Sequence, residues 1–306
     1  MPLAGTLQIC VGMLIALFIA RLLKLRPLEK SLFLVCAAFG NSAALPLLFS
    51  NALFEGASLA TFTSCISFFL LGWTPLFWSV GYGILAAAPE VSQEGDPALG
   101  TGVGNLYGKS SEGGLVGEEK EKKKGFALDR ELLKKAGGRI LTPPLVGAAM
   151  GLIVGLIPQA QMVLEGSVVF DALMTVGRAY TAVAILVLAG NLAMKRNPKT
   201  RLTKETAVRW KRVTFGISFV RFIMMPLVGL GLIKGGVNIW TNPATKLAVL
   251  LEATMPSAQN SVLILTLENK PESAAQMARI LFAVYLIGVL PISLSLSSFL
   301  ALTGFK

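Results

Sequence analysis

The apolar run from Leu247 to Leu267 constrains the fold of this chain more than any other stretch. A run of roughly 20 apolar residues is long enough to cross a lipid bilayer as one helix. Its centre reads Met255-Pro256-Ser257-Ala258-Gln259-Asn260, and a proline removes a helical hydrogen bond and clashes with the preceding turn. Irregular backbone at membrane depth is tolerated only against protein or a wet cavity. The run therefore predicts a broken membrane helix that lines a polar site.

A second interrupted run extends from Ser31 to Phe54 and contains Gly40-Asn41-Ser42-Ala43-Ala44-Leu45-Pro46. Two interrupted membrane segments at corresponding places in two halves of a chain are typical of the midplane binding site of a secondary transporter. We therefore predict that the two breaks cross and that their polar residues form a binding site near the bilayer centre.

The composition indicates a protein that crosses the membrane many times. Hydrophobic residues make up 54% of the 306 residues and charged residues 15%, which departs from the usual composition of soluble domains. The chain has no histidine, its three cysteines lack CxxC spacing, and no GxSxG or HExxH motif occurs. We therefore expect a protein that is not an enzyme, with no catalytic residues, no metal site and no cofactor.

The apolar runs predict eight membrane spans, three before and five after a charged stretch. The chain divides into an N-terminal membrane bundle (1–88), a flexible cytoplasmic linker (89–138) and a C-terminal membrane bundle (139–306). The linker is rich in glycine, glutamate and lysine, and such a composition cannot bury enough apolar surface to fold alone. The predicted spans are Leu7–Leu23, Ser31–Phe54, Leu59–Ala88, Leu141–Ile157, Val168–Met194, Val213–Ile233, Leu247–Leu267 and Ile280–Leu302.

Lysine and arginine concentrate on one side of the predicted membrane. Alternate connections between the spans hold 23 of the 28 basic residues, and the opposite side holds only Lys234, Lys246 and Lys306. Because an excess of positive charge marks cytoplasmic connections, both termini should lie on the non-cytoplasmic side. This topology accounts for the net charge of +11, so we expect the lipid bilayer, and no nucleic acid, as a partner.

In each half of the chain, a broken span is followed by one last span. Repeats with an odd number of spans insert in opposite orientations, which is the inverted-repeat plan of many secondary transporters. We therefore predict an all-α polytopic membrane protein with an inverted-repeat transporter fold and two crossing broken helices. The three and five spans then correspond to part of a five-plus-five plan.

Five motifs occur in a characteristic order and spacing. They are Gly40-Asn41-Ser42-x-x-Leu45-Pro46-Leu47, Thr142-Pro143-Pro144-Leu145-x-Gly147, Leu188-x-Gly190-Asn191-Leu192, Arg221-x-x-x-x-Pro226-Leu227 and Glu252-Ala253-x-Met255-Pro256-Ser257-Ala258-Gln259-Asn260. In these motifs the chain resembles the auxin efflux carrier family, and within it the PIN-like group. The resemblance implies ten helices in two inverted repeats, of which this chain lacks the first two.

The resemblance also implies that the helices form two domains with different roles. Leu7–Ala88 and Val213–Leu302 correspond to a moving transport domain, and Leu141–Met194 corresponds to half of a scaffold through which the family forms homodimers. The PIN-like group implies the endoplasmic reticulum membrane, with the plasma membrane as the second choice. The implied substrate is an auxin-type weak acid, an indole or aryl ring that carries a carboxylate.

The broken helices offer a way to bind such an anion. Half-helix N-termini, with unpaired N–H groups, can hold an anion at the membrane centre without a full positive charge. We expect Asn41 to donate from one break and Gln259 and Asn260 from the other, while Pro46 and Pro256 keep the breaks open. Alternatively, the asparagines only satisfy backbone groups freed by the prolines. The predicted substrate-binding residues are Asn41, Ser42, Pro46, Pro256, Ser257, Gln259 and Asn260.

Four charged residues within the predicted spans are candidates for coupling or support. A carboxylate such as Glu252 costs roughly 2.5–3.5 kcal/mol at membrane depth, so it either titrates a proton or supports the site. Alternatively, it forms a salt bridge with Arg221 or lies at the membrane interface. Arg221 either attracts anions or acts as a structural partner. Asp171 and Arg178 are seven residues apart on one helix face, which favours an ion pair inside the bundle.

These inferences combine into one expected function. We expect a secondary transporter of an auxin-like organic weak-acid anion that works by alternating access, with the substrate bound where the broken helices cross. The alternative is a membrane sensor or scaffold that keeps the transporter fold and binds a ligand without moving it.

Overall fold

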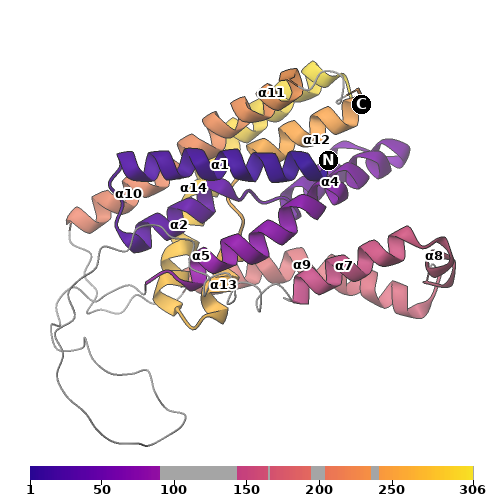
Figure 1. Cartoon of the computed structure of the whole chain (residues 1–306), viewed down its shortest axis with the longest axis horizontal. Helices are drawn as coiled ribbons and strands as arrows, with labels where there is room; N and C mark the ends of the chain where they lie inside the picture. Colours follow the sequence, from indigo (N-terminus) through magenta and orange to yellow (C-terminus); the bar gives the residue numbers. More distant parts are fainter. Residues whose placement is uncertain (90–142, 165, 194–203, 236–240, 306) are drawn as a thin grey trace, which may run out of the picture.

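The computed structural model describes residues 1–89, 143–164, 166–193, 204–235 and 241–305 (Figure 1). Within these ranges the regular structure is helical throughout, apart from one isolated β-bridge between Gly40 and Ser257. This confirms the prediction of an all-α membrane protein. The predicted linker 89–138 lies outside the described residues except for Pro89.

The N-terminal part folds into a series of helices that follow its apolar runs. Residues 31–54 form two half-helices rather than one helix, as the proline and the polar residues predict. A π-helical turn follows Pro75, because the proline cannot donate a hydrogen bond to the preceding turn. The elements are α1 (Pro2–Leu22), α2 (Pro27–Ala38), α3 (Ala44–Leu53), α4 (Gly56–Leu76), η1 (Phe77–Gly81) and α5 (Tyr82–Ala86).

The C-terminal part is helical in the same way, and several of its helices begin at a proline. A proline at the first helical position already has the required φ and lacks only an N–H that the helix does not use. The elements are α7 (Pro143–Leu156), α8 (Pro158–Leu164), α9 (Val168–Ala193), α10 (Lys204–Phe219), η2 (Val220–Met224), α11 (Met225–Gly235), α12 (Pro243–Thr254), α13 (Asn260–Leu267) and α14 (Pro271–Thr303).

Several helices extend beyond the ends of the predicted spans. The last helix begins at Pro271, nine residues before the predicted start at Ile280, because its first turns bury small and polar residues that an apolar run does not include. Four described helical stretches are long and apolar enough to cross a membrane, and the bent pair of α8 and α9 brings the number to at most five. The eight spans and the inverted repeat stay predictions.

The helices pack into one main bundle with a projecting hairpin (Figure 1). Helix α1 packs against α2 and α4, and α12 packs against α11, α14 and α4. The α7–α8–α9 hairpin extends to one side of this bundle, where α9 contacts α13 and α14. At the first break, the buried rings of Phe39, Trp73 and Phe77 pack against one another at centroid distances of 4.6–6.2 Å.

The outer surface of the helices is strongly apolar. On α14, Leu286, Leu290 and Leu294 are each about two thirds or more exposed and repeat every four residues, so they form one stripe. On the projecting hairpin, Met150 and Leu186 are similarly exposed. Large exposed apolar faces mark contact with a membrane or another protein, and together with the apolar helices they fit an integral multi-pass membrane protein.

Candidate substrate site at the crossing of the broken helices

The two helix breaks lie against each other and bond through their backbones. Gly40 and Ser257 form the antiparallel bridge. The N–H of Asn41 donates to the carbonyl of Pro256 at 2.7 Å, and the N–H of Ala258 donates to the carbonyl of Phe39 at 2.9 Å. Each break thus satisfies backbone groups that the other has released from helical bonding, as irregular backbone at membrane depth requires.

Four helix ends meet at this crossing. The half-helices α2 and α12 end there, at Ala38 and Thr254, and α3 and α13 begin there, at Ala44 and Asn260. Helix N-termini carry partial positive charge and unpaired N–H groups, and helix C-termini carry the opposite charge. The crossing therefore presents N–H donors that suit an anion beside carbonyl groups that suit a cation.

Asn41 is buried and holds the first break in shape. Its Oδ1 accepts from the N–H of Ala44 at 3.1 Å, which satisfies a donor in the first turn of α3. Its Nδ2 donates to the Tyr285 hydroxyl at 2.8 Å, and that hydroxyl donates to the Ser257 carbonyl at 3.1 Å. Asn41 thus has the predicted backbone-satisfying role. Because a primary amide carries two N–H bonds, one donor remains for a ligand.

Sequence reasoning missed Tyr285, which bridges the two breaks from α14. Its hydroxyl contacts Asn41 of the first break and Ser257 of the second. Tyr285 lies 25 residues beyond the nearest motif residue, Asn260. The only signal in the sequence is a polar ring within the otherwise apolar run of the last helix, which is too weak to identify a site residue without the fold.

The two serines of the predicted site bind backbone carbonyls at the end of α2. The Ser257 hydroxyl donates to the carbonyl of Cys36 at 2.7 Å, and the Ser42 hydroxyl donates to the carbonyl of Gly40 at 3.4 Å. Both side chains are buried. Pro46 lies in the first turn of α3, where a missing N–H costs nothing, and thus leaves the break intact.

The second break supplies a buried amide with a free donor. Gln259 precedes the first residue of α13, is 9% exposed, and its Nε2 donates to no acceptor among the described residues. Asn260 begins α13 and is partly buried. Pro256 lies inside the break and accepts from Asn41 through its carbonyl. Buried donors without partners are rare in native structures and call for an explanation, and a bound ligand is one.

Arg221 is fully buried and caps the C-terminal end of α12. Its Nε and Nη2 donate to the carbonyl of Met255 at 2.7 and 2.5 Å, and Nη2 also lies 3.4 Å from the carbonyl of Glu252. A cation at a helix C-terminus is favourable. The predicted alternative of a salt bridge between Arg221 and the Glu252 carboxylate is wrong, because the guanidinium binds main-chain oxygens instead and no such pair lies within 4.0 Å.

Glu252 is buried in the last turn of α12, with 2% of its surface exposed. The alternative of a position at the membrane interface stays a prediction. Neither carboxylate oxygen accepts a hydrogen bond from any described residue. Arg221 acts on it electrostatically and the Ser42 side chain lies beside its carboxylate, so it belongs to the crossing.

The remaining predicted pair, Asp171 and Arg178, belongs to α9. Asp171 is exposed on the first turn of α9. The side chain of Arg178 lies outside the described part of the chain, so their ion pair stays a prediction. Among the described residues, no group of three or more histidine, cysteine, aspartate or glutamate side chains could hold a metal ion.

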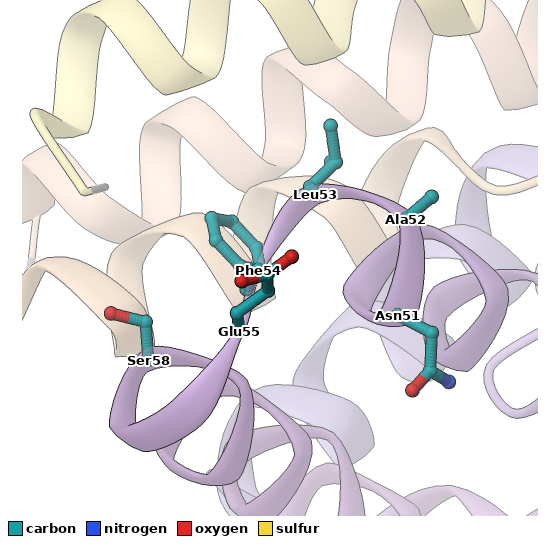
Figure 2. Close-up of a pocket in the computed structure, with 6 residues that line it drawn as sticks. All are labelled: Asn51, Ala52, Leu53, Phe54, Glu55 and Ser58. Carbon is teal, nitrogen blue, oxygen red and sulfur yellow. The ribbon is translucent and has the colours of Figure 1, made fainter.

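One surface pocket lies elsewhere, at the turn from α3 to α4 (Figure 2). Its lining includes Asn51, Glu55 and Ser58, and it contains none of the predicted site residues. The Asn51 amide donates to the carbonyl of Leu47 within the same helix, so its polar groups serve local structure. The crossing remains the candidate substrate site.

Comparison with known proteins gives consistent results. PIN-LIKES 5 of Arabidopsis thaliana is 23% identical over 342 residues, which cover 99% of this chain and 81% of that protein. PIN-LIKES 7 of the same plant is 23% identical over 337 residues with the same coverage. PIN-LIKES 2 is 33% identical over 128 residues, 39% of this chain and 26% of that protein.

No solved structure matches the chain. The model of the family described as membrane transport protein, however, matches residues 1–296, which is nearly the whole chain. With the crossing of two broken helices and relatives named PIN-LIKES, this match shows that the chain belongs to the membrane transport protein family, in its auxin efflux carrier-like branch.

Proposed function

We propose that this protein is a secondary transporter of an organic weak-acid anion, auxin-like in chemistry, that binds its substrate at the crossing and works by alternating access. The observation that carries the proposal is the set of anion-compatible donors at the crossing. These are the N-terminal ends of α3 and α13, the second N–H of Asn41, and the unpartnered Nε2 of Gln259.

The electrostatics of the crossing support release as well as binding. The buried cation nearest to the breaks, Arg221, already donates to the carbonyl of Met255. An anion is then held by amide and main-chain dipoles rather than by a free positive charge. Binding by dipoles alone is moderate, and a transporter needs moderate binding because it must let the substrate go on the other side.

Uptake of labelled indole-3-acetic acid into vesicles that contain the purified protein tests the proposal. The key variant is Asn41→Ala/Asn260→Ala. Asn51→Ala is the matched control, because Asn51 is an exposed asparagine on α3 that bonds only within its own helix. We expect saturable uptake that falls about tenfold or more in the double variant, as the loss of hydrogen bonds to a charged group predicts, and that persists in the control.

A sensor or scaffold of the same fold gives a different result. Such a protein binds the labelled acid at the crossing, with weaker binding in the double variant, and shows no uptake in wild type. Neither uptake nor binding by a folded and inserted protein would rule out both functions for this acid.

We further propose that the protein resides in the endoplasmic reticulum membrane and pairs with a second copy through α7 and α9. Their exposed apolar residues, such as Met150 and Leu186, support an additional membrane or protein contact. Crosslinking of single cysteines placed on α7, and imaging of a tagged protein against organelle markers, test the two parts separately.

A further inference from the structure

We propose that Glu252 is a proton-binding site of the crossing and that it takes up one proton when an organic anion binds beside it. The second part rests on the proposed transport function, whereas the first part does not. The ligand is a proton from the medium, and the acceptor is one carboxylate oxygen of Glu252.

The position of Glu252 is unfavourable for an isolated carboxylate. Its side chain is 2% exposed, so water cannot solvate it. Both oxygens lack a hydrogen-bond donor among the described residues. It also lies in the last turn of α12, where the helix dipole is negative. Burying a charge without hydrogen bonds or a paired ion is among the costliest arrangements in a protein.

The two polar groups that act on Glu252, Arg221 and Ser42, have hydrogen bonds to main-chain carbonyls. Arg221 donates to the carbonyl of Met255. It acts electrostatically on Glu252, on Tyr285 of α14 and on Cys36 of α2, but it donates no hydrogen bond to the Glu252 carboxylate. Ser42 directs its hydroxyl to the carbonyl of Gly40. A proton on Glu252 therefore supplies the donor that the neighbours do not provide, because the acid O–H can donate to the Oγ of Ser42.

The other helices packed against α12 add no charge at this point. From α1, Gln8 donates to the carbonyl of Val249 at 2.8 Å. From α4, Cys65 lies 3.7 Å from the hydroxyl of Thr245. The one charged residue of α11 is the exposed Lys234 near the end of that helix.

The site lies where it can respond to the transported anion. Ser42 follows Asn41, the predicted donor to the substrate carboxylate. A second negative charge beside Glu252 favours the neutral form of the carboxyl group. Because coupling between two ligands is reciprocal, the proton and the anion then strengthen each other's binding. The proton also offsets the charge of the anion, so less net charge crosses the membrane potential than with the anion alone.

Infrared spectroscopy of the purified protein without substrate tests the first part. The wild-type spectrum minus that of Glu252→Gln should contain the C=O stretch of a protonated carboxylic acid, which shifts in D2O and titrates with pH. Glu252→Asp should keep a shifted band, and Glu55→Gln, which alters an exposed acid, should give no such difference band. Only ionised carboxylate bands at every pH between 5 and 8 would overturn the proposal.

Proton uptake on addition of indole-3-acetic acid, measured with an indicator dye in weak buffer, tests the second part. At a pH high enough that the infrared band shows Glu252 ionised in the substrate-free protein, wild type and Glu55→Gln should take up close to one proton per bound acid. Glu252→Gln should bind the acid with no uptake. The Kd of wild type for indole-3-acetic acid should rise by up to about tenfold per pH unit, which is the limit for one linked proton. The Kd of Glu252→Gln should not change with pH. Equal uptake in wild type and Glu252→Gln would refute the coupling. Absence of binding would refute the transport proposal and leave the infrared test to decide the proton site.

Discussion

Gly40 sets the closest approach at the crossing. A Cβ built on this residue lies 2.2 Å from Nη2 and 2.9 Å from Cζ of Arg221, distances at which atoms overlap. The guanidinium is the end of a flexible side chain, but it moves away only by giving up its bonds to Met255. Glycine is thus required here to leave room for a neighbouring side chain.

We predict that Gly40→Ala destabilises the protein by about 1–3 kcal/mol, as overpacking of a core does. Thermal unfolding in detergent should show a lower midpoint. Gly231→Ala in α11 is the control, because a Cβ there meets no atom within 4 Å and alanine is the better helix former. An unchanged midpoint for Gly40→Ala would mean that the guanidinium moves aside at no cost.

Tyr285 connects the two breaks through a single hydroxyl group. Tyr285→Phe removes the acceptor of the Asn41 amide and a donor to the Ser257 carbonyl. We predict a loss of about 1–3 kcal/mol in stability, because buried polar groups are left unpaired, together with weaker binding of indole-3-acetic acid. Tyr82→Phe loses a hydroxyl bond to Glu268 away from the crossing and should change stability without changing affinity. If Tyr285→Phe and Tyr82→Phe bind indole-3-acetic acid with the same affinity, Tyr285 does not belong to the substrate site.

At the scale of elements, the helix ends determine how the crossing forms. The chain places prolines at the first turns of α2, α12 and α14, so these helices begin where they do for local reasons. A π-helical turn, η2, carries Arg221 into the crossing. Such turns are rare and often mark functional sites.

Lys270, the residue before α14, binds the C-terminal end of α5. Lys270 Nζ donates to the carbonyls of Ala86 and Ala88, at 2.6 Å each, and of Leu85 at 3.3 Å. A lysine that binds the last carbonyls of a helix stabilises its C-terminus. This contact holds α13 against α5. Because α13 begins at the second break, the contact also positions that break.

We predict that Lys270→Met speeds hydrogen exchange in residues 82–89 and lowers stability by about 0.5–1.5 kcal/mol, the net value of a typical hydrogen bond. Mass spectrometry of the exchanged protein measures the effect. Lys234→Met removes an exposed lysine near the end of α11 and serves as the comparison. Unchanged exchange at residues 82–89 would show that water replaces the lysine fully.

At the scale of the whole molecule, the contacts agree with the charge distribution. Among the described residues, two connections predicted to be cytoplasmic meet, since Glu29 pairs with Arg209 at 3.6 Å. Lys270, in a third, binds the carbonyl of Ala88 at the end of a predicted span. At the other end, the rings of Phe54 and Phe305 lie 5.0 Å apart. These described contacts agree with the predicted topology, in which the basic connections share one side of the membrane.

We predict that a cysteine in place of Lys30 reacts with a membrane-impermeant maleimide from the cytoplasmic side only. A cysteine in place of Glu55 should react only from the opposite side. Both native residues are exposed, so access depends on topology alone. Unmodified protein, whose cysteines are buried or lie within predicted spans, gives the background. Reaction of both cysteines from one side would contradict the predicted topology.

The sequence by itself determined the features that depend on neighbouring residues. Apolar runs and prolines predict where the helices lie and where Ser31–Phe54 and Leu247–Leu267 break, because hydrogen bonding and steric clash act within a turn or two. Motif order predicted the family. Helix boundaries were less accurate, as at Pro271, because burial of small polar residues depends on the partner helix.

Only the tertiary structure decided which groups meet at the crossing. It joined Tyr285 to Asn41, turned Arg221 towards the Met255 carbonyl, and left the Glu252 carboxylate without a donor. These contacts link residues from 34 to 244 positions apart. No local pattern specifies such pairs, because they depend on how separate helices pack and on which donors each buried acceptor can reach.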